Sequence, residues 1–452
     1  MKKNLTKREV LSVSSMLFGL FFGAGNLIFP ISMGQMAGKH LWLAAAGFLI
    51  TGVGLPLLVV AALGLSRKDG LLELGCNVGR RYGVFFTVLC YLTIGPFFAI
   101  PRCATVSFTV GLEQYVNGNH ETLFLEIFSL LFFLCVLYFS LKPGEILTWI
   151  GKILNPLFLL LLALLLIRCM FSPMGKITEV IPIGAYASQP FFQGFLEGYN
   201  TMDAIAGLAF GIIVVNVIRS LGVESAGDVA KNTVKAGMFS SALMGIIYVC
   251  VAMAGATSRG ILPLAENGGI GFLQIAHHYY GKTGGLILAG MVTVACLKTA
   301  IGLITSCGET FVKLFPNGPS YRTWAILFCV GSFLFANLGL NAIITYSLPV
   351  LMFLYPLAIT LALLAIFGKW FGNAKVVYQW TTAFTLVAAG LDFVTALPES
   401  LKEAVGILKM LENMRGYLPL AEYGFGWVMP ALIGLGVGCI STGIGKSENK
   451  SR

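Results

Sequence analysis

The chain has 452 residues, of which 57% are hydrophobic and only 11% are charged, and its mean hydropathy is +0.85. Soluble globular domains carry about 25% charged residues, so this composition excludes a soluble protein and predicts a polytopic membrane protein. The formal net charge of +10 does not indicate a nucleic-acid partner, because the basic residues are scattered over predicted loops and form no stripe with interleaved aromatic residues.

Twelve apolar stretches are long enough to cross a bilayer. The N-terminal stretch lacks a small-residue cleavage site, so we interpret it as the first span and not as a secretory signal. Lysine and arginine number 20 on the side of both termini and 8 on the other, which predicts cytoplasmic termini by the positive-inside rule. The predicted spans are 12–37, 41–65, 83–111, 124–141, 148–170, 191–218, 235–257, 286–310, 323–339, 343–367, 376–396 and 425–442.

The first span is interrupted near its centre by Gly23-Ala24-Gly25-Asn26, with Pro30 close behind. Glycine, asparagine and proline all weaken or stop a helix. Irregular backbone at membrane depth is tolerated only where it is buried in protein or lines a polar cavity, so this break predicts a site. The alternative is a glycine-packed helix with a proline kink.

Arg102 lies inside the third span, between prolines that predict kinks. One hypothesis pairs it with Glu197 or Asp203 as part of a gate. The other has it cap the backbone carbonyls freed at the kinks of Pro96 and Pro101.

The sixth span contains a second interruption, Gly194-Phe195-Leu196-Glu197-Gly198-Tyr199-Asn200-Thr201-Met202-Asp203, in which Gly and Asn stand beside two carboxylates. Two glycine-interrupted segments at matching places in two halves of a membrane protein are typical of a transporter built from inverted repeats. We therefore expect one membrane domain over 1–452, with repeat one at about 12–170, repeat two at about 191–367 and extra helices at about 376–442.

The ends of the half-helices at the two breaks can bind charged groups. A half-helix exposes N–H groups at its N-terminus, which suit a carboxylate, and carbonyls at its C-terminus, which suit a cation. An amino acid carries one group of each kind, so two broken helices can hold its backbone by main chain alone. Phe21, Phe22 and Phe191 would then be free to line an apolar pocket, although most phenylalanines of such a chain face lipid or core.

Other functions find little support in the sequence. The ten cysteines include no CxxC pair and the four histidines no ligand spacing, no nucleophile and base fall together within a span, and no phosphate-binding GxxxxGK[ST] motif occurs. We expect neither an enzyme nor a channel, and no metal except a coupling sodium. Segment 259–282 is predicted to be an extracellular loop with a short helix that acts as a lid, and 397–424 an amphipathic surface helix.

Four segments together resemble the branched-chain amino acid:cation symporter family of bacteria, within the amino acid/polyamine/organocation superfamily. The resemblance covers essentially the whole chain. It implies an all-α fold of about 12 transmembrane helices, with a five-plus-five inverted-repeat core like that of sodium-coupled leucine transporters, broken helices 1 and 6, and two extra helices. It also implies import of leucine, isoleucine and valine across the bacterial inner membrane by symport with a cation, sodium by default. The four segments are 23–30, 95–102, 198–204 and 295–303.

The resemblance implies roles for individual residues. The backbone of Ala24 and Gly25 would bind the substrate carboxylate, and carbonyls around Phe21 would face its amine. The second break would contribute Tyr199, Asn200 and Thr201. Sodium ligands would be Asn26 at a first site. At a second site they would be carbonyls near Leu20 and Gly23 or Phe22, the carbonyl of Ala295 and two adjacent hydroxyls.

The sequence departs from the family at that hydroxyl pair, where two threonines are usual and this chain has Lys298-Thr299. The Lys298 ammonium would occupy the second sodium site and make transport sodium-independent or proton-coupled, or else it snorkels or pairs with a carboxylate such as Asp203 and leaves coupling intact. Sodium or a proton is thus the expected coupling ion, without another cofactor. The expected partners are the substrate and the lipid bilayer, with no obligate protein partner, and another apolar or cationic amino acid is the alternative substrate.

Overall fold

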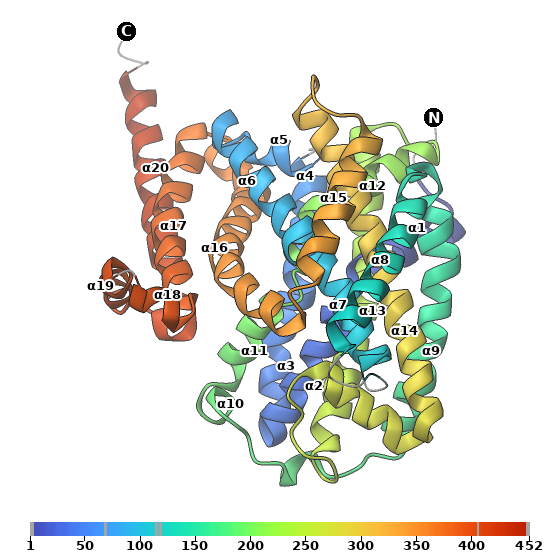
Figure 1. Cartoon of the computed structure of the whole chain (residues 1–452). Coiled ribbons are helices and arrows are strands. Elements are labelled where there is room, and N and C mark those ends of the chain that lie inside the picture. Colours follow the sequence, from blue (N-terminus) through green and yellow to red (C-terminus); the bar gives the residue numbers. More distant parts are fainter. Residues whose placement is uncertain (1–3, 67–69, 114–115, 117–119, 405, 449–452) are drawn as a thin grey trace.

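The computed structural model describes residues 4–448 except 67–69, 114–115, 117–119 and 405. The described residues form helices and connecting turns, with no strand among them. Eight helical stretches are long and apolar enough to cross a membrane by length and composition. Figure 1 shows the long helices running roughly side by side, with both chain termini at the same end of the molecule.

Each of the twelve predicted spans corresponds to one helix or to a run of shorter ones. In the first half these are α1 (Lys7–Phe21) with α2 (Gly25–Ala37); α3 (Leu41–Leu49), η2 (Ile50–Gly54) and α4 (Leu55–Ser66); α6 (Arg80–Leu92), η3 (Thr93–Phe97) and α7 (Ala99–Gly111); α8 (Glu121–Ser140); and η7 (Leu147–Leu154) with α9 (Asn155–Phe171). In the second half they are α11 (Pro190–Tyr199) with α12 (Asp203–Ser220), α13 (Ala226–Ser258), α14 (Gly268–Leu314), α15 (Tyr321–Ala336), α16 (Leu340–Phe367), α17 (Lys375–Ala396) and α20 (Val428–Glu448).

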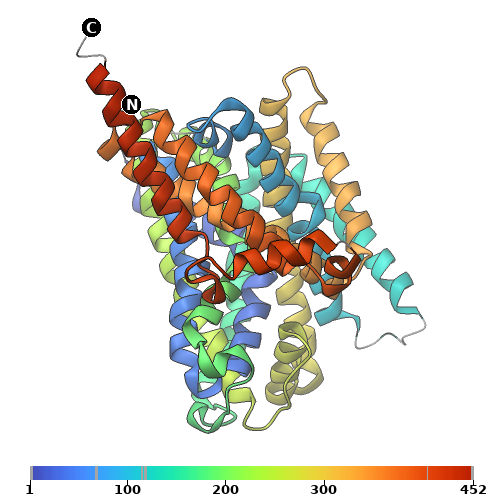
Figure 2. The same cartoon turned by 90° about the vertical axis from the view of Figure 1, so that its left-hand side faces the viewer.

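Short helices join these spans. They are η1 (Gly38–His40), α5 (Leu71–Gly75), η6 (Pro143–Glu145), η8 (Ile177–Glu179), α10 (Ala185–Ser188), η9 (Gly368–Phe371), α18 (Glu399–Ala404), α19 (Gly406–Arg415) and η10 (Ala421–Tyr423). The last span pair stands apart from the main bundle: α17 and α20 pack on each other, and α17 also packs on α16. Figure 2 shows this pair on the near side after a quarter turn.

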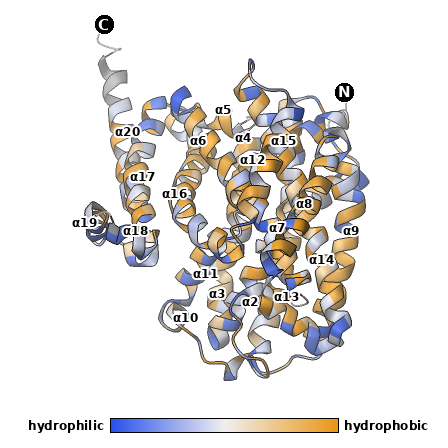
Figure 3. Ribbon diagram, viewed as in Figure 1, coloured by the Kyte–Doolittle hydropathy of each residue, from blue (hydrophilic) through white to orange (hydrophobic). Residues whose placement is uncertain are grey.

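Hydropathy follows this arrangement. Apolar residues run along most of each long helix, and polar residues gather at helix ends and connecting loops (Figure 3). The outer faces expose large apolar side chains such as Leu131, Leu160 and Val387, as expected of surfaces in contact with lipid tails. The core is filled by the inner faces of α1, α2, α7, α12, α13 and α14.

The third span is broken as well. It passes through the π-helical turn η3, where Gly95 has non-helical φ −84° and ψ −122° and precedes Pro96. The ring of a proline removes one backbone donor and clashes with the preceding turn. Proline and glycine therefore bend this span just before Arg102, and the kink predicted at Pro96 is confirmed, whereas Pro101 lies within the helical turns of α7.

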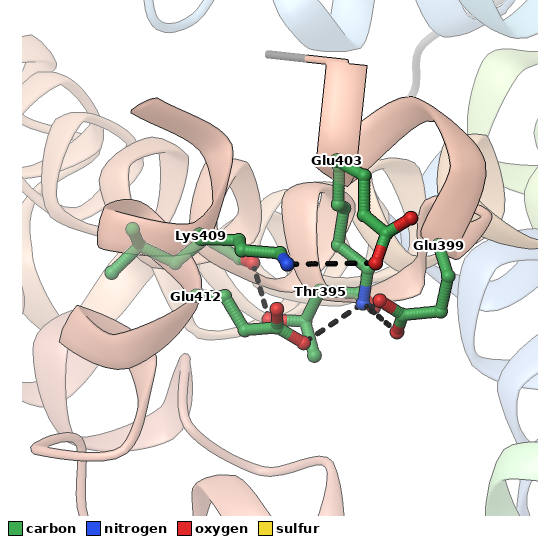
Figure 4. Close-up of polar contacts among 7 residues, drawn as sticks. Thr395, Glu399, Glu403, Lys409 and Glu412 are labelled. Atoms are coloured by element: carbon green, nitrogen blue, oxygen red, sulfur yellow. Dashed lines mark hydrogen bonds and ion pairs between the residues drawn. The ribbon is translucent and has the colours of Figure 1, made fainter. Parts of the chain in front are cut away.

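Two connecting segments differ in detail from their predictions. The short helix expected within 259–282 is the first arm of α14, which continues through a bend at Gly281 (φ +56°) into the span. The single amphipathic helix expected over 397–424 is instead two short helices, α18 and α19. Lys402 of α18 is paired there with Glu399 (2.6 Å) and Glu412 (2.9 Å), in the cluster that Figure 4 shows.

Candidate functional site

The first span is broken where the sequence predicts. α1 ends at Phe21, Phe22 leaves the helical region (φ −76°, ψ +89°), and α2 restarts at Gly25. The first N–H groups of a helix have no intrahelical partner, and the N-cap Ala24 has no side chain that caps them. The side chain of Asn26 instead turns back, and its Oδ1 accepts a hydrogen bond from Gly23 N (2.9 Å). The start of α2 therefore presents N–H groups without intrahelical partners beside the break.

The second break lies between α11 and α12. α11 ends at Tyr199, Met202 adopts a left-handed conformation (φ +63°), and α12 begins at Asp203. Thr201 supports the turn, because its hydroxyl donates to the carbonyl of Gly198 (2.9 Å) and accepts from Asp203 N (3.4 Å). Both expected broken helices are thus confirmed.

Asp203 connects the two breaks. Its Oδ2 accepts hydrogen bonds from Asn26 Nδ2 (2.5 Å) and from the hydroxyl of Tyr248 on α13 (2.8 Å), and Asn26 Nδ2 also contacts that hydroxyl. Both Asn26 and Asp203 are 2% exposed. Burying a carboxylate at membrane depth costs free energy, and residues that do so usually have a function. The triad of Asn26, Asp203 and Tyr248 is therefore a candidate functional site.

Arg102 of α7 is 3% exposed, and its side chain extends to the second break. Its Nη1 donates to the carbonyl of Asn200 (2.8 Å) and its Nη2 to that of Thr201 (3.5 Å), while the guanidinium lies 5.3 Å from the ring centroid of Phe29. Arg102 therefore caps carbonyls of the second break, and not those of the kinks in its own span. No ion pair joins it to Glu197 or Asp203 within the described part of the chain, so the ion pair expected of a gate is not present.

A small cavity of about 20 Å³ lies between the breaks, which is room for about one water. An amino acid is larger than this cavity, so the surrounding helices must separate before it can bind. The cavity brings together most of the predicted site residues with several new ones. Its lining includes Leu20, Phe21, Gly23, Ala24, Gly25, Asn26, Ala99, Arg102, Cys103, Thr201, Met202, Asp203, Ala206, Thr299 and Leu303.

Other predicted site residues lie outside this lining. The ring of Tyr199 stacks on that of Tyr355, with centroids 4.0 Å apart, so it faces α16. Asn200 contributes its carbonyl to Arg102, and Glu197 stays half-buried on α11. Phe22 stacks on Phe18 and Tyr248, Phe191 contacts Phe192, and Ala295 is buried in α14.

Lys298 is fully buried on α14 and points toward α9 and α1. Its Nζ donates to Asn155 Oδ1 (3.0 Å) and lies 4.0 Å from the ring centroid of Phe158. It neither snorkels nor pairs with Asp203, and no carboxylate partner appears among the described residues. Its neighbour Thr299 lies at the break itself and donates to the carbonyl of Leu20 (3.2 Å). Lys298 and Thr299 therefore both lie beside the end of α1.

Sequence reasoning missed Tyr248 and Asn155. Neither stands in a broken segment, and one tyrosine within a 33-residue helix gives no local signal. Asn155 begins an apolar helix beside Pro156, where asparagine also serves as an ordinary helix-start residue. Only the packing of α9 and α13 against the breaks assigns these side chains their partners.

A family model described as branched-chain amino acid transport protein matches residues 6–444. The chain belongs to this family. It is 52% identical over 435 residues to the branched-chain amino acid permease BrnQ of Lactobacillus delbrueckii subsp. lactis, covering 96% of each chain. It is 41% identical to the permease BraB of Bacillus subtilis strain 168, covering 98% of this chain and 97% of that one, and 37% identical to BrnQ of Escherichia coli K12, covering 96% and 95%.

Solved structures support the fold of this family member. The chain is similar to Mhp1, a nucleobase-cation-symport-1 family transporter, with a TM-score of 0.58, 14% identity, and coverage of 95% of this chain and 91% of that one. It is also similar to MhsT in complex with L-phenylalanine, with a TM-score of 0.57, 14% identity, and coverage of 98% and 99%. At such identities the likeness concerns the fold alone. The protein is a multi-pass membrane transporter of branched-chain amino acids with a sodium-coupled leucine transporter-like core, and its relatives are named permeases and not enzymes.

Proposed function

We propose that the protein imports leucine, isoleucine and valine across the bacterial inner membrane by symport with a cation. The observation that carries the proposal is the cavity between the two breaks, which contains the free N-terminus of α2, the end of α1 and the start of α12. The substrate carboxylate binds the N–H groups near Ala24 and Gly25, and carbonyls near Phe21 face the amine. Leu20, Phe21 and Leu303 supply apolar walls for a branched side chain.

Alternating access follows from rocking of the elements around this site. Because the cavity of about 20 Å³ is smaller than an amino acid, one helix group must move relative to the other for substrate to enter and leave. Both termini are proposed to be cytoplasmic, on the side that carries most lysine and arginine. Accessibility of single cysteines in place of exposed Asn4 and exposed Lys176, in a cysteine-depleted chain in whole cells, tests this orientation.

Coupling has two candidates. Sodium would bind between the end of α1 and Thr299, whose hydroxyl already contacts the Leu20 carbonyl. Alternatively, the Lys298 ammonium serves as a resident cation. The second candidate is favoured by the position of Lys298, which lies between Asn155 and the rings of Phe18 and Phe158 without an acidic partner among the described residues.

Uptake of labelled leucine into proteoliposomes tests the function and separates the candidates. The wild type and Lys298→Thr are each given a sodium gradient, a proton gradient or neither. Sodium-driven uptake by the wild type would eliminate Lys298 as the resident cation. Sodium-independent uptake by the wild type, together with sodium dependence gained by Lys298→Thr, would establish it. Failure of the wild type to accumulate any branched-chain amino acid under every gradient would refute the proposed function.

A further inference from the structure

We infer that Arg102 and Asp203 are the two charged poles of the substrate site, with Arg102 binding the carboxylate of the amino acid and Asp203 its ammonium. This inference rests on the proposed function and deepens it. Main chain alone would then not suffice for recognition, and the two side chains would do more than open or close a gate.

Arg102 lies at the predicted carboxylate site. A Cβ built on Gly25, the first residue of α2, would be only 2.9 Å from Arg102 Nη2. The guanidinium therefore stands directly beside the free N–H groups of that helix start, and the absence of a side chain at Gly25 leaves it room. A helix N-terminus and a guanidinium both favour an anion. Together they form a binding site for the substrate carboxylate.

The guanidinium also has capacity to spare. An arginine offers five N–H donors in a fixed fork, and its hydrogen bonds to the carbonyls of Asn200 and Thr201 occupy only part of that fork. Those bonds hold the side chain in place, so that little conformational freedom is lost when a carboxylate binds. A charge this deeply buried, without an acidic partner among the described residues, costs free energy unless a ligand supplies the opposite charge.

Asp203 supplies the opposite pole. Asn26 and Tyr248 both donate to Oδ2 of its carboxylate, which fixes the orientation, and a carboxylate with about four lone-pair sites keeps acceptor capacity for an ammonium. Asp203 lines the same cavity as Arg102. The ammonium and carboxylate of an amino acid leave the same carbon, so the groups that recognise them must face one small space, as these two do.

Ligand analogues isolate each pole. Leucinamide keeps the ammonium and lacks the carboxylate, and 2-hydroxy-4-methylpentanoate keeps the carboxylate and lacks the ammonium. Affinities of leucine and both analogues are measured on purified full-length protein in detergent by displacement of labelled leucine or by thermal shift. The variants are Arg102→Gln and Asp203→Asn, and exposed Arg322→Gln serves as the charge-removal control.

For the wild type, and equally for Arg322→Gln, we expect leucine to bind at least about 30-fold more tightly than either analogue, since hydrogen bonds to charged groups are strong. Arg102→Gln should reduce the leucine-to-leucinamide preference to about threefold or less while keeping the preference over the hydroxy acid. Asp203→Asn should do the reverse. If Arg102→Gln does not fold, Arg102→Lys, which keeps the charge and loses the fork, should still reduce the leucinamide preference by at least about threefold.

A merely structural role would weaken all three ligands by the same factor and leave both preferences at their wild-type values, and that result would overturn the inference. Wild-type protein that binds leucine but shows this uniform loss in the variants would refute the poles and leave the proposed function standing. Wild-type protein that binds no branched-chain amino acid would refute both.

Discussion

Asn26 Nδ2 lies 2.5 Å from Asp203 Oδ2, in a hydrogen bond between residues 177 positions apart in the sequence. Each residue stands in the first turn of the half-helix that follows a break. The bond therefore ties the restart of α2 to the restart of α12, and Tyr248 adds a third helix to the same carboxylate oxygen. A movement that separates the two breaks must break or carry along this contact.

Replacing Tyr248 with phenylalanine should destabilise the protein by about 1.5–3 kcal/mol, the worth of a hydrogen bond to a charged group. The ring contacts with Phe22 and Phe48 remain, so the loss is that of the hydroxyl alone. Tyr91→Phe is the matched control, because the hydroxyl of Tyr91 donates to the neutral carbonyl of Ala209 (3.3 Å). Thermal unfolding in detergent measures both, and equal losses would show that Asp203 is not charged there.

Asn155→Leu should destabilise the protein by about 3 kcal/mol, because it leaves the Lys298 ammonium buried without its oxygen partner (3.0 Å). Lys298→Met in the same chain should restore part of that loss, since two apolar side chains then replace the polar pair, whereas the hydrogen bond from Asn155 Nδ2 to Ser15 Oγ (2.9 Å) stays lost. The double-mutant cycle is measured by thermal unfolding. If the two single changes simply add, the contact carries no coupling energy.

Gly47 and Gly194 let α3 and α11 touch backbone to backbone. A Cβ on Gly47 would lie 2.0 Å from the Phe191 carbonyl oxygen, and one on Gly194 would lie 2.0 Å from that of Ala44. Either glycine changed to alanine should force the helices apart at a cost of about 1–3 kcal/mol or more. Size-exclusion profiles of detergent extracts should show less folded protein.

Gly290→Ala is the control for this pair, because nothing lies within 4 Å of its added Cβ. Alanine is the better helix former by up to about 1 kcal/mol, so this variant should be as abundant as the wild type or more so. Equal losses from all three variants would contradict the packing argument.

Lys402 should make the attachment of α19 depend on pH. Hydrogen bonds to Glu399 and Glu412 raise its pKa above the ordinary value. The stability from this cluster is therefore complete below the ordinary lysine pKa and lost as the pH rises through the higher folded value. Hydrogen exchange of α19 should be unchanged between pH 7 and 9 relative to α17, once corrected for the intrinsic pH effect, and should accelerate at higher pH.

Lys402→Met supplies the comparison, because it removes the ammonium at every pH. Its α19 should already exchange faster at pH 7, with no further relative increase at high pH. A wild-type α19 that exchanges as fast as that of the variant at pH 7 would show that the cluster does not hold the helix.

The sequence by itself determined the membrane class, the order of the spans and the two breaks. A stretch of about twenty apolar residues commits a chain to the bilayer whatever it packs against. Gly23 to Asn26 and Gly198 to Asp203 interrupt helices through local backbone preferences, which need no tertiary context. The same locality explains the bend at Gly95-Pro96.

Tertiary structure alone decided which side chains meet at the breaks. The sequence left two kinds of partner open for Arg102: carboxylates, or the backbone carbonyls at the kinks of its own span. The packing of α7 places its guanidinium on the carbonyls of Asn200 and Thr201 instead. Tyr199, inside a predicted binding motif, stacks on Tyr355. Lys298 donates a hydrogen bond to Asn155, which lies 143 positions away in the sequence. The physical reason is that a buried polar group must satisfy its hydrogen bonds within reach, and in a helical bundle what lies within reach is set by the packing of helices distant in sequence.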